Sequence, residues 1–197
     1  MIITSIKPNI SRPQAVARFR GRLNELRHGR LRIVTDFYVP YRVFRLTRTD
    51  GRSSPDAFIA ADAVTGKLDL IQFDRSPEED ACMAVDTEMV AEERVAEEEA
   101  YRLVRESMMR SIFLKGFFKL SRLNVEIELA ASAHILYWVG VYERNGRAQL
   151  EIINALRGRF EGAKLRELVA EWFQPRQEGG AVSEDLMENR SWKRSAD

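Results

Sequence analysis

Two histidines, His28 and His134, are the side chains of this sequence best suited to acid–base chemistry near neutral pH. His134 opens the apolar run HILYWVGVY, and alternate residues of an extended segment share one face. It therefore shares a face with Trp138 and Tyr142, and together with Tyr41 of an earlier strand these residues could enclose a small ligand. A buried, hydrogen-bonded histidine is the more common arrangement, and we favour it over a pocket. His28, at a helix end among arginines, is expected to be a solvated cation or a cation at the helix C-terminus.

Asp62 stands in the segment DAVTGK, where a carboxylate could serve as a general base. A short side-chain oxygen at the start of a tight turn also accepts hydrogen bonds from the turn's backbone, and Gly66 is free to adopt a positive φ. Asn154 occupies the matching place in the later segment NALRGR, and an amide can cap a turn but cannot act as a base. We therefore predict a structural role for Asp62.

Established catalytic motifs do not occur in the sequence, which has no Gly-x-Ser-x-Gly, no phosphate-binding Gly-rich loop and no His-Glu-x-x-His. Cys82 is the single cysteine, which excludes an intrachain disulfide, and its acidic neighbours disfavour the reactive thiolate. The glutamate-rich run 92–99 could hold a hard cation, but a solvated helix face is more common. We predict no catalytic residue, metal site or cofactor, and lean towards a protein that is not an enzyme.

Charge is distributed unevenly, although the whole chain carries a net charge of +1. Residues 1–50 contain 11 Lys/Arg and 3 Asp/Glu, whereas residues 51–100 contain 4 and 14. Arginines of the first predicted helix could bind phosphate or nucleic acid. They are Arg18, Arg20, Arg22 and Arg27. Aromatic partners for stacking bases are lacking there, and the acidic second quarter can neutralise these charges, so nucleic acid is the less favoured partner.

Neither a secretory signal nor a membrane span is predicted. The first residues lack an apolar run of signal-peptide length, and the longest apolar stretch, 135–142, is too short to cross a bilayer. We therefore expect a cytoplasmic protein. The segment 107–123 is both basic and apolar and could lie on a membrane surface, but packing on the sheet or on a second subunit of a homodimer is favoured.

Apolar periodicity and turn residues predict alternating helical and β-rich regions. The predicted helices are 12–27, with Phe19, Leu23 and Leu26 on its apolar face, 77–123 and 163–173. The second of these could also start at 86 or 87, and Gly116 could bend or break it. The predicted strands are 2–6, 31–37, 39–47, 57–64, 67–73, 124–130, 134–142 and 147–156. Pro40 is expected to divide the second strand from the third, or to mark an edge or a bulge. Turns are predicted at 49–52, 64–67 and 143–146, the last of which contains Asn-Gly.

Two stretches of the sequence match later ones, which predicts an internal pseudo-repeat. YRVFRLTRTDGR at 41–52 matches LYWVGVYERNGR at 136–147 at a shift of 95. ADAVTGK at 61–67 matches INALRGR at 153–159 at a shift of 92. The difference of three residues falls in the first hairpin, where loop length costs little.

These matches, each after a predicted helix, predict an α+β fold built from two helix-plus-antiparallel-meander units. The units are 1–76 and 77–173, merged into one domain, and residues 174–197 are expected to form a flexible tail. We expect the sheet to be covered by helices mainly on one face.

The turn DAVTGK resembles the closing hairpin of PepSY-type domains, in which an Asp-Ala-x-Thr-Gly pattern recurs. Together with YVPY at 38–41, it is also similar to stretches of uncharacterised bacterial proteins. The layout of a helix followed by a meander, used twice, is similar to the TATA-binding-protein fold. These resemblances imply a hairpin and a layout, and they imply no mechanism.

Apolar-rich strands without a reactive constellation predict a non-catalytic binding or protein-interaction module that acts as a homodimer or with a protein partner. The first alternative is a small-ligand sensor or enzyme with a pocket near His134. The second alternative is a nucleic-acid binder that uses the basic N-terminal helix.

Overall fold

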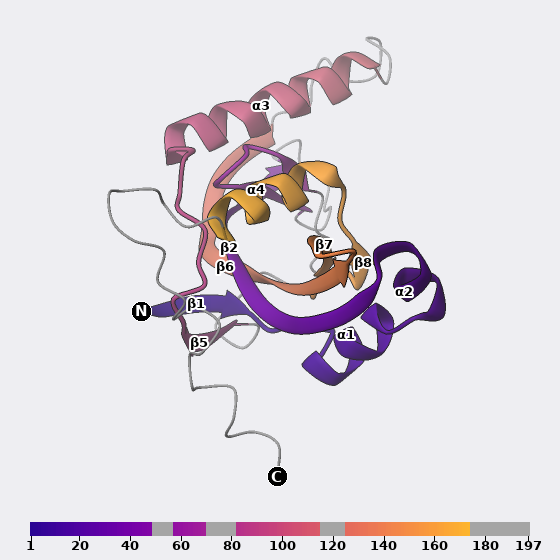
Figure 1. Ribbon diagram of the computed structural model, residues 1–197. Coiled ribbons are helices and arrows are strands. Elements are labelled where there is room, and N and C mark those ends of the chain that lie inside the picture. Colours follow the sequence, from indigo (N-terminus) through magenta and orange to yellow (C-terminus); the bar gives the residue numbers. More distant parts are fainter. Residues whose placement is uncertain (49–56, 70–81, 115–124, 174–197) are drawn as a thin grey trace, which may run out of the picture.

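The computed structural model of the protein describes residues 1–48, 57–69, 82–114 and 125–173, and for 48, 69 and 111–114 the backbone alone. These residues form helices and one eight-stranded mixed sheet, so the predicted α+β class is confirmed (Figure 1). The described strands are β1 (Ile2–Ile6), β2 (Arg30–Arg48), β3 (Ala57–Asp62), β4 (Leu68–Asp69), β5 (Cys82–Asp86), β6 (Val125–Arg144), β7 (Arg147–Asn154) and β8 (Arg159–Phe160). The described helices are α1 (Arg12–Phe19), α2 (Arg22–His28), α3 (Glu97–Leu114) and α4 (Ala163–Phe173).

The two longest strands, β2 and β6, pair antiparallel along their length and form the centre of the sheet. Their register runs from Arg30 opposite Glu143 to Arg48 opposite Val125. β2 continues into β3 and β4, and β6 continues into β7 and β8, each by antiparallel pairing. β1 pairs with β5 and joins β6 by a parallel pairing. Both predicted meanders therefore belong to one sheet.

Two pairs of predicted strands are single strands in the structure. β2 combines the predicted strands 31–37 and 39–47, and β6 combines 124–130 and 134–142. Of the alternatives predicted for Pro40, the break is wrong, because Pro40 stays within β2 and its carbonyl accepts a hydrogen bond from Ala63 N on the side of β2 away from β6. The Pro40 nitrogen faces the same side, so the ladder with β6 loses no donor.

The predicted helix 12–27 is wrong as one helix, because the chain breaks near Gly21. α1 closes before the break, where Gly21 N donates to Arg18 O, and α2 then begins a new direction. α2 buries none of its residues. Leu23 and Leu26, expected on the apolar face of one continuous helix, are 81% and 69% exposed.

The predicted helix 77–123 is also wrong over its first part. Cys82–Asp86 forms β5, which pairs with β1, and α3 begins only at Glu97. Three glutamates in the first turn of α3 stabilise its N-terminus. Residues 82–86 form a strand because β1 pairs with them, and no local pattern in the sequence indicates that distant partner.

Two local predictions are confirmed. The last helix spans Ala163–Phe173, as its apolar spacing predicts. The hairpin of β6 and β7 turns at Asn145 and Gly146, whose φ angles of 53° and 71° are those of the turn that Asn-Gly favours. The predicted turn at 49–52 and the predicted tail 174–197 lie outside the described residues.

The sheet bends around α4, which lies inside the curve, whereas α1 and α2 lie outside it (Figure 1). On the inside, Val169 of α4 belongs to one buried cluster with Phe37, Val39, Ile135 and Tyr137 of the two central strands. These side chains alternate along β2 and β6, as a period of two requires. The inner face of the sheet is therefore closed by the last helix of the described chain.

Outside the curve, α1 and α3 pack on two further clusters. Phe19 of α1 is fully buried over Gly140, where an added Cβ would lie 2.8 Å from the Phe19 ring. Val104 of α3 packs with Phe44 and Ile59. Coverage mainly on one face is thus not confirmed, because α4 packs on the face opposite α1.

Asp62 and Asn154 cap two turns of the same geometry. Asp62 Oδ1 accepts hydrogen bonds from the backbone N–H groups two and three residues ahead, at 2.7 and 3.2 Å. Asn154 Oδ1 accepts the same two bonds at 3.0 and 3.0 Å. Gly66 and Gly158 close these turns at φ 69° and 65°. The structural role predicted for Asp62 is confirmed.

The strands before these turns correspond at a shift one residue larger than the sequence match. Tyr41 lies opposite Asp62 and Tyr137 lies opposite Asn154, which gives a shift of 96 rather than 95. The two tyrosine hydroxyls meet at 2.7 Å between β2 and β6. The sequence match rests on the hairpin ends, TDGR and RNGR, and the pairing of the strands decides the register instead.

Replacing Asp62 tests its role as a turn cap. Asp62→Ala leaves two turn N–H groups without their acceptor, and we expect the free energy of unfolding to fall by about 1–3 kcal/mol. Asp62→Asn keeps the accepting oxygen, as Asn154 does in the second turn, and should cost less than about 1 kcal/mol. Urea unfolding of the two variants measures the difference, and equal losses would contradict the capping role.

Candidate functional site

The residues predicted to form a pocket anchor the N-terminal segment to β6. His134 Nδ1 lies 3.0 Å from Thr4 O. Trp138 Nε1 donates to Ile10 O at 2.8 Å, and Tyr142 Oη donates to Phe19 O at 2.7 Å. Trp138 and Tyr142 share the outer face of the sheet as their spacing predicts. The polar atom of each aromatic side chain is thus engaged by a backbone carbonyl.

Tyr41 lies apart from these residues, on the inner face with Tyr137. Burial, followed by the neighbouring Tyr41, raises the pKa of Tyr137 well above its ordinary value. Burial, followed by Glu151 and Glu25, raises the pKa of Tyr142 to about 12. Both phenols therefore stay protonated at neutral pH, in the form that donates a hydrogen bond.

The four arginines predicted to bind phosphate do not form one face. Arg18 donates to Gly158 O and ties α1 to the turn before β8. Arg20 and Arg22 are exposed on either side of Gly21. Arg27, at the end of α2, is exposed and its carbonyl accepts a hydrogen bond from Arg144 of the β6–β7 hairpin at 2.6 Å.

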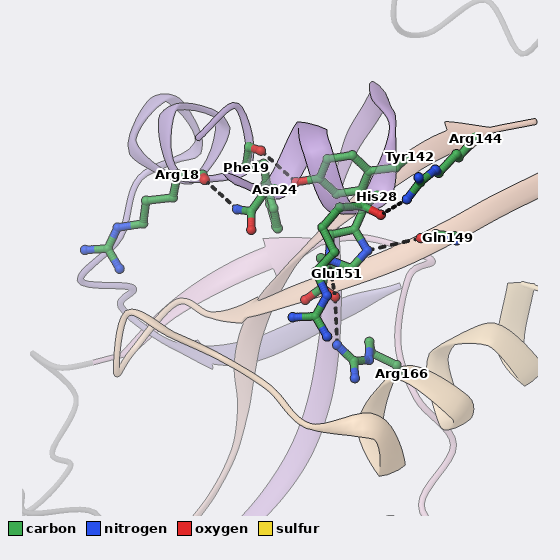
Figure 2. Close-up of polar contacts among 10 residues, drawn as sticks. Arg18, Phe19, Asn24, His28, Tyr142, Arg144, Gln149, Glu151 and Arg166 are labelled. Carbon is green, nitrogen blue, oxygen red and sulfur yellow. Dashed lines mark hydrogen bonds and ion pairs between the residues drawn. The ribbon is translucent and has the colours of Figure 1, made fainter. Parts of the chain in front are cut away.

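His28 is not solvated, but it lies in the last turn of α2, which is the helix-end position that the sequence also predicts. Its side chain is 13% exposed and lies against Tyr142, with the ring centres 5.5 Å apart. His28 Nδ1 is 3.1 Å from Gln149 Oε1, and Nε2 is 3.2 Å from Glu151 Oε1 (Figure 2). Both ring nitrogens therefore face acceptors on β7.

Glu151 is the buried centre of this polar group, which we call the Glu151 cluster (His28, Gln149, Glu151 and Arg166). The residue is 6% exposed, and its Oε1 also accepts from Arg166 Nη1 of α4 at 2.7 Å (Figure 2). A buried carboxylate is tolerated when hydrogen-bonded cations compensate it. The cluster thus ties the end of α2 and the helix α4 to β7. A glutamate among the apolar residues of the strand RAQLEIIN was the sequence feature that could have indicated it.

One edge of β7 is open beside the cluster. β7 pairs with β6 along its length, but β8 covers only Ile153 and Asn154 on the other side. Ile152 O accepts from Glu161 N on that side, and directions alternate along a strand, so Ala148 and Leu150 also point their N–H and C=O groups away from β6. Among the described residues, these four backbone groups have no hydrogen-bond partner.

A groove of about 390 Å³ follows this edge. Residues 148–151 of β7 form its floor, with Arg27 and His28 of α2 on one wall. Arg166, Glu167 and Ala170 of α4 form the other wall. An extended chain could lie in this groove and pair with β7.

Comparison with known proteins found no match, since no family model, curated protein or solved structure is similar to this chain. The resemblances to PepSY-type domains and to the TATA-binding-protein fold stay predictions. None of the described helices has the length and apolarity that crossing a membrane requires. Within the described ranges, no group of three His, Cys, Asp or Glu side chains is placed to hold a metal ion.

Two glutamates of the β6–β7 hairpin give a matched test of the cluster. Glu151→Gln removes a buried charge that holds His28 and Arg166, and we expect the free energy of unfolding to fall by about 1–3 kcal/mol. Glu143 pairs with Arg32 at 2.8 Å where both side chains are 46% exposed. Glu143→Gln should therefore cost less than about 1 kcal/mol. Urea unfolding at pH 8 compares them, and a loss for Glu143→Gln as large as that for Glu151→Gln would contradict the role of the cluster.

Proposed function

We propose that this chain is a non-catalytic protein-interaction module that takes up an extended segment of a partner along the edge of β7. The observation that carries the proposal is the row of open backbone groups on Ala148 and Leu150, beside a groove. Exposed sheet edges add strands readily unless charge, proline, a bulge or a covering segment blocks them. Addition of a strand would supply two donors and two acceptors to the partner's main chain.

The surroundings of the edge favour a rigid platform over a reactive centre. Both nitrogens of His28 face acceptors, and Glu151 Oε1 contacts His28 and Arg166 together. A general base needs an unoccupied nitrogen or oxygen within reach of the substrate's proton, and neither ring nitrogen of His28 is unoccupied. The Glu151 cluster instead holds α2 and α4 at a fixed distance from β7, which keeps the groove open for a chain.

We also propose that the chain contains two related units within one sheet, β1–α1–β2–β3–β4 and β5–α3–β6–β7–β8. The two capped turns, with the same hydrogen bonds, support this relation. Two parallel pairings support it as well, Ser5 with His134 and Val90 with Tyr38. In these pairings His134 of β6 corresponds to Tyr38 of β2 at a shift of 96 positions, the same shift that relates Tyr137 to Tyr41. In this arrangement β7 is the counterpart of β3.

Selection from a displayed library of random 12-residue peptides tests the proposed function. We expect peptides that bind the full chain to bind Ala148→Pro at least about tenfold more weakly, because proline lacks the outward N–H and places a ring at the edge. Edge strands accept proline where the N–H faces solvent, so this variant should stay folded.

Ala148→Val is the matched control, because it keeps the N–H and has a high strand propensity. Its affinity for the selected peptides should stay close to that of the unchanged chain. Failure to enrich any peptide, or peptides that bind Ala148→Pro as tightly as the unchanged chain, would overturn the proposal.

A further inference from the structure

We infer that the partner segment is an extended peptide in which acidic and apolar side chains alternate, with the acidic ones facing α2. This inference rests on the proposed function and adds the chemistry of the partner. It follows from a difference between the two faces of the sheet at the β7 edge, because the face towards α2 and the face towards α4 carry different residues.

The face towards α2 carries uncompensated positive charge. Arg144 and Arg147 lie opposite each other at the hairpin end, on the same face as Gln149 and Tyr142, and Arg27 stands beside them on the groove wall. None of these three arginines forms a salt bridge with another described residue, and all three are exposed.

Carboxylates on this face are mostly engaged already. Glu151 is held by His28 and Arg166. Glu143 lies opposite Ala148, so it belongs to the α4 face, and it pairs with Arg32. Glu25 of α2 is exposed, and it is the carboxylate there that forms no salt bridge with a described residue. The balance therefore favours an acidic ligand at the α2 face.

The face towards α4 has the opposite character. Leu150 packs against the inner buried cluster, and Ala148 points to the same side because it is two residues away. Ala170 of α4 lines the groove there, and so does Glu167, which would repel an acidic side chain. Successive side chains of an added strand alternate between the two faces, so apolar residues would fall on the α4 side.

Two other occupants of the groove, a nucleic acid and a second copy of this chain, fit its charges and backbone groups less well. A single-stranded nucleic acid would contact the arginines, but its sugar–phosphate backbone has no N–H and C=O groups to pair with Ala148 and Leu150 as a strand does. A second copy of this chain, paired antiparallel along Ala148 and Leu150, would bring its Glu151 towards Arg147, but that carboxylate is already held by His28 and Arg166. The alternating acidic segment satisfies both the backbone groups and the charges.

Fluorescence anisotropy of the full chain with labelled octapeptides tests the inference. The probes are Val-Glu, Val-Gln and Val-Lys repeats, which differ in charge and share strand propensity. We expect the Val-Glu peptide to bind at least about tenfold more tightly than the Val-Gln peptide, and binding to weaken as salt is raised. Binding of the Val-Lys peptide should be undetectable.

Variants locate the effect. The substitutions Arg147→Gln and Arg27→Gln should each lower the affinity for the Val-Glu peptide about two- to fivefold, as expected for exposed charges. Arg105→Gln on α3, far from the groove, is the matched control and should leave the affinity unchanged. Ala148→Pro should lower the affinity for the Val-Glu peptide at least about tenfold.

The outcomes separate this inference from the proposed function. Equal affinity for the Val-Glu and Val-Gln peptides, both lowered by Ala148→Pro, would overturn the acidic partner and leave the interaction module standing. Binding of the Val-Glu peptide that Ala148→Pro does not affect would overturn both. Two further results would overturn the acidic segment as the occupant. The first is that oligothymidylate displaces the peptide and binds Ala148→Pro as tightly as the unchanged chain. The second is that light scattering shows a dimer of the unchanged chain and a monomer of Ala148→Pro.

Discussion

The antiparallel pairing of β2 with β6 is the interaction on which the rest of the structure depends. These strands come from distant parts of the chain, and each uses its C-terminal half to begin a hairpin of its own. Their length makes the sheet bend, as twisted strands do, and the bend creates an inner face and an outer face. Every described helix packs on one of these two faces.

The bend also explains why the edge of β7 matters. α4 fills the inside of the curve and α2 stands outside it, so the two helices flank the same edge from opposite faces (Figure 1). Glu151 connects them around that edge through Arg166 and His28. Because β8 is short, no described strand covers β7 at Ala148 and Leu150, and the Glu151 cluster lies beside this edge. An open edge with fixed walls suits recognition of a main chain more than catalysis.

Local features of the fold could be predicted from the sequence. The Asn145–Gly146 turn, the helix Ala163–Phe173 and the cap at Asp62 depend on residues close together in the chain, whose conformational preferences decide the outcome. The shared face of Trp138 and Tyr142 follows from the period of two.

Features that depend on distant partners could not be predicted in the same way. β5 is a strand because β1 pairs with it, and the two strands lie far apart in the sequence. Pro40 stays within β2, where its carbonyl accepts a hydrogen bond from the backbone N–H of Ala63 in the turn after β3. The Glu151 cluster joins His28 to residues more than a hundred positions later, and only the fold brings them together. The candidate site was therefore missed, and the predicted aromatic residues serve as anchors for the N-terminal segment.

Amide hydrogen exchange along β7, followed by NMR on the free chain, tests the central claim most directly. If the edge is open, the N–H groups of Ala148 and Leu150 exchange rapidly, whereas those of Gln149 and Glu151, bonded to β6, are protected. Uniform protection of all four amides would mean that the edge is already occupied, and it would contradict the account.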